Sequence, residues 1–239
     1  MKGVILAGGK GTRLFPLTKV TNKHLLPVGS YPMIYYPIFK FKEVGITDIL
    51  VVTGIEHMGD VIRLLGSGVE FGVSFTYKVQ DKAAGIAHAL LLAEDFVGQD
   101  VCLVILGDNI FEDALDDFVK SYQERPEGAK VLLKEVQDPT RFGVPTIAGS
   151  KILAIEEKPR LPKSSYCVTG VYIYDQSVFS YIKKLKPSAR GEYEITDVNN
   201  TYIEDKKLSF STLAGWWTDA GTPESLLLAN NLAKEMVLF

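Results

Sequence analysis

Two features of the sequence predict an α/β fold with a mostly parallel central sheet and helices on both faces. Strand-length apolar runs alternate with helix-like stretches through the first half of the chain. Apolar strands separated by helices are typical of a parallel sheet buried between two helical layers. Two of these runs end in loops that carry glycine and polar residues, at positions 8–11 and 107–109. Ligands bind such sheets at the carboxyl ends of the strands, so both loops are candidate binding elements.

The elements of the first half follow from apolar runs bounded by turn or helix signals. Pro32 suits the first turn of a helix and Gly45 suits its end. The run VCLVIL is the most apolar strand of the chain. The predicted strands span residues 2–7, 48–53, 74–79, 101–106 and 130–136. The predicted helices span residues 32–44, 56–65, 85–94 and 111–124.

The second half alternates less regularly and predicts a mixed α+β arrangement. Residues 142–146 and 151–156 form an expected hairpin around Ala148-Gly149-Ser150, and residues 215–221 are expected to form a loop. Further strands are predicted over residues 168–174 and 208–213, and helices over residues 177–185, 194–205 and 223–235. With no repeat or obvious linker, we expect a single domain, residues 1–239. It would have an α/β half of about residues 1–136 and a mixed half of about 137–239.

Composition excludes several classes of protein. The chain has 239 residues, of which 46% are hydrophobic and 23% charged, as in ordinary globular proteins. A net charge of −3 argues against non-specific nucleic-acid binding. The apolar runs are far too short to span a membrane, and no signal-peptide core is present. Cys102 and Cys167 lie in strand-like runs and fit buried thiols in a reducing compartment, so we expect a cytoplasmic protein.

The first loop, in LAGGKGTR, matches neither of two familiar phosphate-binding motifs. A dinucleotide motif needs glycine where Leu14 stands, and a P-loop needs Lys followed by Ser or Thr directly after its second glycine. What remains is a glycine-rich loop whose free N–H groups lie beside a cation, which suits a phosphate group.

Two aspartates are candidate metal ligands. Asp108 follows the apolar strand in LGDN, and Asp219 lies in the loop before the closing helix, in WTDAG. Two carboxylates completed by phosphate oxygens and water are a common way to hold Mg²⁺. A turn or helix-capping role for Asp108 is equally open from its position alone.

Nine motifs resemble those of bacterial sugar-1-phosphate nucleotidylyltransferases, in the same order and spacing from Met1 to about Asn231. They are LAGGKGTRLFPLT, KHLLPV, VQDKAAGIAHAL, LGDNIF, RFGV, EEKP, VTGVYIYD, LKPSARGEYEITDVN and WTDAGT. The first marks the broad family, and the combination of LGDNIF, EEKP, VTG and LKPSARGEYEITD is similar to its thymidylyl branch. The resemblance implies a Rossmann-like fold and transfer of a thymidylyl group from dTTP to α-D-glucose 1-phosphate. The products would be dTDP-glucose and pyrophosphate, in the first step of dTDP-rhamnose synthesis.

The resemblance also implies roles for individual residues. Arg13, Lys158, Asp108 and Asp219 would carry the reaction, and Asp108 and Asp219 would hold Mg²⁺. The expected sugar-phosphate pocket comprises Gly143, Glu157, Lys158, Val168 and Tyr172, with support from Arg190. The expected nucleotide site comprises Leu6, Ala7, Gly8, Gly9, Gly11, Thr12, Arg13, Lys23, His24, Gln80, Gly85 and Asp108. Gln80 and Gly85 match positions that hydrogen-bond the base.

The sequence departs from the commoner family pattern at two histidines. His24 and His88 stand where many members have glutamine. Whether His24 contacts the nucleotide stays open, and His88 is expected to pack or to lie on a helix surface. A UTP-dependent uridylyltransferase and a catalytically silent nucleotide-sugar sensor are the alternatives; a sensor predicts erosion at Arg13, Asp108, Lys158 or Asp219, and all four are intact.

Regulation is a further expectation from the resemblance. Longer members carry a helical C-terminal segment that contributes to a subunit interface and a second nucleotide-sugar site. Here the sequence ends at Phe239 after the closing helix. We therefore expect a homo-oligomer, if one forms, to use surfaces of the core domain. Feedback by dTDP-rhamnose is expected to be weak or competitive.

Overall fold

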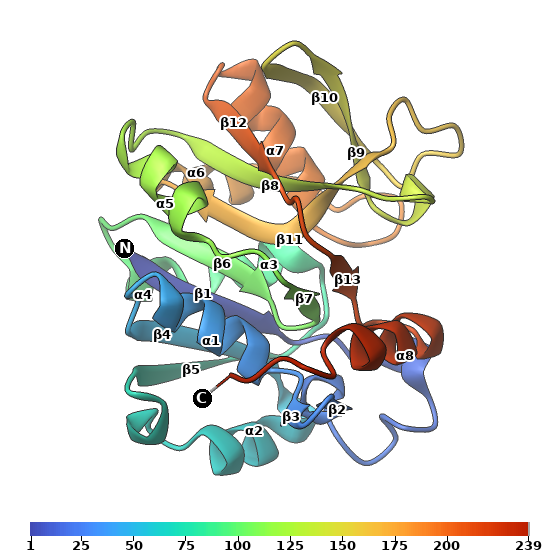
Figure 1. Cartoon of the computed structure of the whole chain (residues 1–239). Coiled ribbons are helices and arrows are strands. Elements are labelled where there is room, and N and C mark those ends of the chain that lie inside the picture. Colours follow the sequence, from blue (N-terminus) through green and yellow to red (C-terminus); the bar gives the residue numbers. More distant parts are fainter. Residues whose placement is uncertain (239) are drawn as a thin grey trace.

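The computed structural model describes residues 1–238 and contains one nine-stranded sheet that runs through the molecule (Figure 1). Two strands lie off the main path of this sheet: β8 (Ala129–Glu135) pairs with β11 and with β12 (Leu208–Thr212). The path itself runs in the order β10 (Lys151–Glu157), β9 (Gly143–Ala148), β11 (Tyr166–Tyr174), β6 (Cys102–Leu106), β1 (Lys2–Ala7), β4 (Asp48–Gly54) and β5 (Ser74–Gln80).

The half of the sheet built from β6, β1, β4 and β5 is parallel. Ile5 lies between Val51 and Ile105 in register, and all three side chains are fully buried on one face. Val4 and its neighbour Val104 are equally buried on the opposite face. Burial on both faces explains why β1, β4 and β6 are continuous apolar runs, and the predicted mostly parallel central sheet is confirmed.

Helices cover both faces of the sheet. On one face lie α1 (Tyr35–Glu43), α2 (Met58–Leu65) and α5 (Asp116–Gln123), whose apolar residues share a core with Ile5 and Val51. On the other face lie α3 (Ile86–Leu91), α4 (Glu94–Val97), α6 (Ser177–Ile182) and α7 (Ile195–Glu204), which pack on the face of Val4. None of the helices within residues 1–238 is both long and apolar enough to cross a bilayer.

The rest of the sheet is largely antiparallel. The strand β11 runs antiparallel to β6, β8 and β9, and β12 is parallel to β8. The predicted hairpin of β9 and β10 is present, and Gly149 in its turn has a left-handed φ of 58°. Thus β11 connects the parallel half to β9 and β10, which carry Gly143 and Glu157 of the expected sugar-phosphate pocket.

Two short strand pairs were not predicted. The strand β7 (Asn109–Phe111) pairs with β13 (Trp217–Asp219), which lies inside the segment expected to be a loop, and the helix expected over residues 111–124 begins only at Asp116. Similarly, β2 (Pro27–Val28) pairs with β3 (Tyr31–Pro32), so Pro32 precedes α1 instead of lying in its first turn. Strands of two or three residues show no periodicity, and their pairing partners order them.

The closing helix α8 (Pro223–Leu232) begins with a capping box in which Thr222 and Ser225 satisfy each other's backbone N–H groups. It packs in a third core cluster with Leu14 and Val28. After this helix, Leu238 is buried in the same cluster, while Phe239 lies outside the described residues. This cluster ties the C-terminal helix to the loop that follows β1.

Candidate active site

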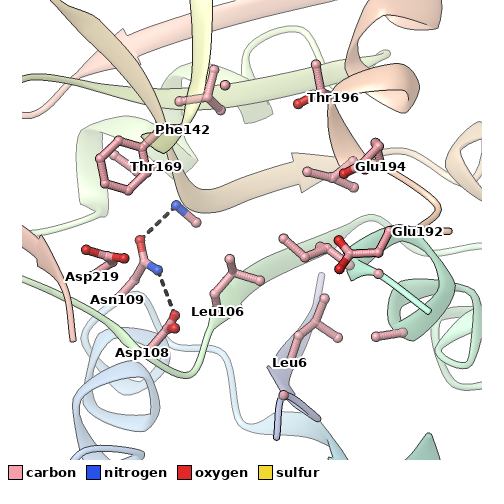
Figure 2. Close-up of a pocket in the computed structure, with 18 of the residues that line it drawn as sticks. Leu6, Leu106, Asp108, Asn109, Phe142, Thr169, Glu192, Glu194, Thr196 and Asp219 are labelled. Atoms are coloured by element: carbon pink, nitrogen blue, oxygen red, sulfur yellow. Dashed lines mark hydrogen bonds between the residues drawn. The ribbon is translucent and has the colours of Figure 1, made fainter. Parts of the chain in front are cut away.

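A cavity of about 520 Å³ lies at the carboxyl ends of β1 and β6 and extends to β9, β10 and β11 (Figure 2). Most of the predicted site residues line it. Three do not: Ala7 is fully buried at the end of β1, and Gly11 and Thr12 form the turn behind the loop. The residues that do line it are Leu6, Gly8, Gly9, Arg13, Lys23, His24, Gln80, Gly85, Asp108, Gly143, Glu157, Lys158, Val168, Tyr172 and Asp219. Arg190, the expected support of the sugar-phosphate pocket, lines it as well.

The glycine loop turns sharply after β1. Gly11 has a left-handed φ of 63°, and its carbonyl accepts a hydrogen bond from the Thr18 hydroxyl at 2.7 Å. One turn of 3-10 helix, Thr12–Leu14, follows, and Leu14 is fully buried beneath it. Arg13 therefore projects toward the cavity, where a Cβ added to Gly221 would lie 2.9 Å from its Nη2 atom. The loop thus presents backbone and a guanidinium to the same space.

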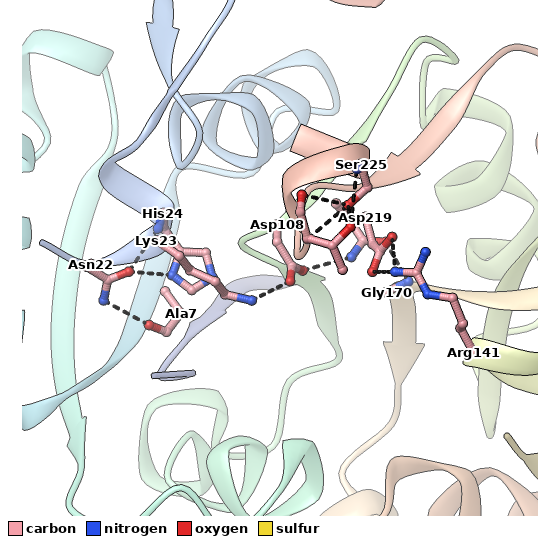
Figure 3. A network of polar contacts seen from close by, with 11 residues as sticks. Ala7, Asn22, Lys23, His24, Asp108, Arg141, Gly170, Asp219 and Ser225 are labelled. Atoms are coloured by element: carbon pink, nitrogen blue, oxygen red, sulfur yellow. Dashed lines mark hydrogen bonds and ion pairs between the residues drawn. The ribbon is translucent and has the colours of Figure 1, made fainter. Parts of the chain in front are cut away.

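Asp108 lies at the centre of a polar network (Figure 3). Lys23 Nζ and Asp108 Oδ2 form a short ion pair. Burial acts to raise the pKa of Asp108, but the nearby Lys23 charge and the hydrogen bonds from Lys23 and Asn109 together outweigh it and hold this pKa well below its usual value. Asp108 is therefore an ionised carboxylate at the carboxyl end of β6.

His24 is buried behind this ion pair. Its Nδ1 lies 2.7 Å from Asn22 Oδ1, and Asn22 Nδ2 donates to the carbonyl of Ala7 at 3.3 Å. Burial, with a further contribution from Lys23, lowers the pKa of His24 to about 3. The imidazole is therefore neutral and donates from Nδ1, because the amide oxygen of Asn22 can only accept.

Asp219 reaches the same cavity from the opposite side. The pairing of β13 with β7 sets Asp219 opposite Asn109, the residue that follows Asp108 in the sequence. Arg141 Nη2 lies 3.2 Å from Asp219 Oδ2 (Figure 3). Burial, and then the negative charge of Asp108, raise the pKa of Asp219 to about 6. The Asp108 carboxylate is therefore close enough to act on the ionisation of Asp219.

Asn109 connects the strands that carry these aspartates (Figure 2). Its Oδ1 accepts from the backbone N–H of Gly170 and from Trp217 Nε1, each at 2.8 Å. Because that oxygen has two donors, Nδ2 must point the other way, and it donates to Asp108 Oδ1 at 3.1 Å. Gly170 is needed here, since an added Cβ would lie 2.5 Å from Asn109 Nδ2.

The pair Asp108 and Asp219 fits a divalent cation. No cluster of three or more His, Cys, Asp or Glu side chains suited to a metal occurs within residues 1–238. Asp108 and Asp219 nevertheless line one cavity with the glycine loop, and the charge of Asp108 acts on the ionisation of Asp219. Mg²⁺ is commonly held by one or two carboxylates, with phosphate oxygens and water completing its shell, so this donor set suits it.

The far end of the cavity carries a second network around Glu157. Thr196 Oγ1 donates to Glu157 Oε2 at 2.6 Å. Arg190 Nη2 lies 3.4 Å from Glu157 Oε1 and 2.8 Å from Glu194 Oε2. Lys158 follows Glu157 with a left-handed φ of 48°, uncommon for a residue with a side chain. These side chains come from β10, from the segment before α7 and from α7 itself.

The remaining predicted residues form walls of the cavity. Gly143 packs closely, since an added Cβ would lie 3.2 Å from both Ile155 Cγ2 and Thr196 Oγ1. Val168 and Tyr172 lie on β11, and burial raises the pKa of Tyr172 far above its usual value, so its phenol stays neutral. At the other end, Gly85 has a φ of 99° and precedes α3.

Sequence reasoning assigned no role to several residues that line the cavity. Arg141 and Asn109 lie in the quoted motifs RFGV and LGDNIF, and Thr196 lies in EITD. Their presence in these motifs was the one sequence signal that could have marked them as site residues. Their contacts join segments up to about a hundred residues apart, which no local pattern shows. Trp217 lies in the quoted motif WTDAGT, and its indole Nε1 donates to Asn109 Oδ1.

Comparisons of the sequence with known proteins identify the family of the chain. The sequence model of the nucleotidyl transferase family matches residues 2–235. A curated glucose-1-phosphate thymidylyltransferase of Neisseria meningitidis is 47% identical over 230 residues, or 95% of this chain and 80% of that protein. The one of Mycolicibacterium smegmatis is 43% identical over 242 residues, or 100% of this chain and 84% of that protein.

Solved structures show the same fold. A crystal structure described as a glucose-1-phosphate thymidylyltransferase from Bacillus anthracis with bound sucrose has a TM-score of 0.96 and 64% identity, covering 99% of this chain and 96% of that one. A UDP-glucose pyrophosphorylase with UDP-glucose has a TM-score of 0.87 at 26% identity, covering 97% of each chain. The resemblance seen in the motifs is confirmed, and the chain belongs to the nucleotidyl transferase family of enzymes.

Proposed function

We propose that the protein transfers a thymidylyl group from dTTP to α-D-glucose 1-phosphate, with release of pyrophosphate. One observation carries the proposal: a single cavity holds Arg13 and the glycine loop at one end, Glu157 and Lys158 at the other, and two aspartates between them. The first set suits a triphosphate, and the second suits a sugar phosphate.

The proposed reaction is an in-line displacement. A phosphate oxygen of the sugar phosphate attacks the α-phosphorus, and the bond to the pyrophosphate oxygen breaks with its electron pair. A phosphate dianion needs no general base, so charge repulsion and alignment are the main obstacles. Lys158 orients the attacking phosphate, and Arg13 neutralises charge that grows on the leaving pyrophosphate.

The aspartates supply the metal site of the proposal. Asp108 and Asp219 would hold Mg²⁺, and Asn109 and Trp217 keep Asp108 in place. When bound, the ion offsets negative charge on the phosphates and aligns them. Removal of divalent ions with EDTA is expected to abolish pyrophosphate release, and added Mg²⁺ is expected to restore it.

Two alternatives remain testable. A uridylyltransferase would use the same cavity, because the imide edge is common to thymine and uracil. The higher identity to the thymidylyltransferases, 43% and 47% against 26% for the UDP-glucose pyrophosphorylase, favours dTTP. A silent nucleotide-sugar sensor would not need the four residues proposed to carry the reaction, all of which line the cavity.

The test is pyrophosphate release by the purified protein with glucose 1-phosphate, Mg²⁺ and each nucleoside triphosphate in turn. Rapid release with dTTP is expected. Release that is faster with UTP would favour the uridylyltransferase, and binding without any release would favour the sensor.

Further proposals concern the location of the protein, its partners and the division of its chain. The molecule would act in the cytoplasm, as the first enzyme of dTDP-rhamnose synthesis, without nucleic-acid or membrane partners. Residues of about 1–136 would form the nucleotide half and about 137–239 the sugar-phosphate half of a single domain. Sedimentation of the purified protein would determine whether it forms a homo-oligomer.

A further inference from the structure

The side-chain amide of Gln80, at the end of β5, is held by two neighbours. Its Nε2 lies 3.3 Å from the carbonyl oxygen of Gly85 and 3.0 Å from Nδ1 of His88. The Gly85 carbonyl can only accept, which requires the amide nitrogen to face it. The two amide hydrogens therefore point to Gly85 and to His88, and His88 Nδ1 is the acceptor.

The opposite end of the amide lies at the glycine loop. A Cβ added to Gly8 would lie only 2.6 Å from Gln80 Oε1. Gly8 therefore leaves space for this oxygen, and both residues line the cavity. With Nε2 committed to its two acceptors, Oε1 is the part of the amide that remains to accept a hydrogen bond from a ligand.

His88 is itself held in place. Its ring stacks on Tyr193 with the centroids 6.1 Å apart and the planes at 27°. Tyr193 also fixes the start of α3, because its N–H donates to the Ala84 carbonyl at 2.8 Å and its carbonyl accepts from Ala87 at 3.2 Å. The imidazole is thus presented to Gln80 from a rigid frame.

We propose that His88 is a positioning residue that fixes the direction of the Gln80 amide and thereby sets which bases the site accepts. The inference rests on the proposed function, in which Gln80 contacts the base. Thymine and uracil carry a donor at N3, whereas cytosine carries an acceptor there. An amide oxygen turned toward the base accepts a hydrogen bond from N3–H of thymine or uracil, but it repels the acceptor N3 of cytosine. Two buried acceptors that face each other without a hydrogen bond would therefore disfavour dCTP.

The experiment compares kcat/KM for dTTP and dCTP in the wild type and in three variants at His88. Lysine has only donors, so His88→Lys favours a Gln80 amide turned around, with Oε1 toward residue 88. His88→Leu removes the acceptor for Gln80 Nε2, whereas His88→Gln retains an acceptor. The ratio of dTTP to dCTP is expected to fall about tenfold in His88→Leu, roughly one hydrogen bond, and further in His88→Lys. His88→Gln is expected to stay near the wild type.

Other readouts separate positioning from a merely structural role. If His88 acts through Gln80, the KM for glucose 1-phosphate stays unchanged in all three variants, and calorimetry shows dTTP binding weakened while dCTP binding is not. Equal losses for both nucleotides, or an unchanged ratio in both His88→Leu and His88→Lys, would overturn the inference. Should His88→Lys fail to fold, the contrast between His88→Leu and His88→Gln decides.

A Gln80→Leu variant distinguishes this inference from the proposed function. If Gln80→Leu loses the discrimination and the His88 variants keep it, Gln80 contacts the base but His88 does not orient it. If Gln80→Leu keeps the discrimination, Gln80 does not select the base, and this inference fails while thymidylyl transfer stands. Absence of pyrophosphate release by the wild type with dTTP would refute the proposed function itself.

Discussion

The two ends of the cavity differ in how their cations are balanced. At the glycine-loop end, Lys23 is paired with Asp108, but Arg13 has no ion-pair partner among residues 1–238. At the other end, Arg190 lies within 3.6 Å of carboxylate oxygens of Glu157, Glu192 and Glu194. A triphosphate needs cations that carboxylates have not neutralised, whereas sugar hydroxyls need carboxylates in a fixed orientation. The unpaired Arg13 therefore suits the triphosphate proposed for its end, and the carboxylates held by Arg190 suit the sugar.

The two ends also differ in how they are built. The glycine-loop end comes from consecutive backbone that leaves β1, with Gly8, Gly11 and Arg13 within six residues. The Glu157 end requires side chains from β10 and α7 to meet, as in the Thr196–Glu157 hydrogen bond of 2.6 Å. Single substitutions are thus expected to affect the nucleotide and the sugar phosphate separately, except at the shared aspartates.

The shared aspartates give the largest expected effect. Replacing Asp108 or Asp219 by Ala removes a proposed metal ligand from a charge-dominated transfer, so kcat is expected to fall about a thousandfold or more. Asp60 on α2, which is half-exposed and lies outside the cavity lining, provides the control, since Asp60→Ala is expected to leave turnover unchanged. Near-normal rates of both cavity variants at saturating Mg²⁺ would contradict the metal assignment.

Arg13→Ala is expected to act at the nucleotide end. Charge on the departing pyrophosphate grows in the transition state, so kcat is expected to fall on the order of a hundredfold, with little change in the KM for glucose 1-phosphate. Steady-state kinetics with each substrate varied measures this. A rise in the KM for glucose 1-phosphate alone would indicate that Arg13 acts at the sugar-phosphate end of the cavity, which would contradict this assignment.

Lys158→Ala is expected to act at the sugar-phosphate end. It should raise the KM for glucose 1-phosphate and lower kcat, together about a hundredfold in kcat/KM, because the attacking phosphate loses its orienting cation. Binding of dTTP, measured by calorimetry, is expected to change little. The exposed Lys163→Ala is the matched control. Loss of dTTP binding in Lys158→Ala would mean that the two ends are interchanged.

Thr196→Val tests the network around Glu157 with a smaller change. The variant keeps the shape of the side chain but removes the hydrogen bond to Glu157, whose removal costs about 1–1.5 kcal/mol. The KM for glucose 1-phosphate is expected to rise about tenfold, while that for dTTP stays constant. Parallel increases in both constants would show that Thr196 supports the fold and not the sugar end alone.

The preference for dTTP over UTP is the smallest expected effect. The Gln80 amide cannot distinguish thymine from uracil, which differ by one methyl group. Burial of that methyl is worth about 0.8 kcal/mol, roughly fourfold in kcat/KM. Initial rates with each triphosphate at low concentration measure the ratio. A ratio that favours UTP would replace the thymidylyl assignment with the uridylyl alternative.

Local patterns allowed most of the fold and much of the site to be predicted. The strands β1, β4, β5 and β6 were placed within one or two residues. For β1, β4 and β6 the reason is that continuous apolar runs ended by glycine have few other interpretations. The resemblance in motifs then supplied the candidate site residues, and most of them line the cavity. The motifs therefore supplied residues that the fold brings to one cavity, and the roles of these residues stay predictions.

The sequence by itself determined the parallel half of the sheet, the glycine loop and the family, because these depend on neighbours along the chain. The tertiary structure alone decided that Asp219 lies beside Asp108, since the pairing of β7 with β13 joins segments about a hundred residues apart. It also decided that Asn109 points at Asp108, that Arg141 pairs with Asp219 and that His88 bonds Gln80. Each of these contacts depends on side-chain direction and strand register, which the packing of the whole domain sets and no local periodicity encodes.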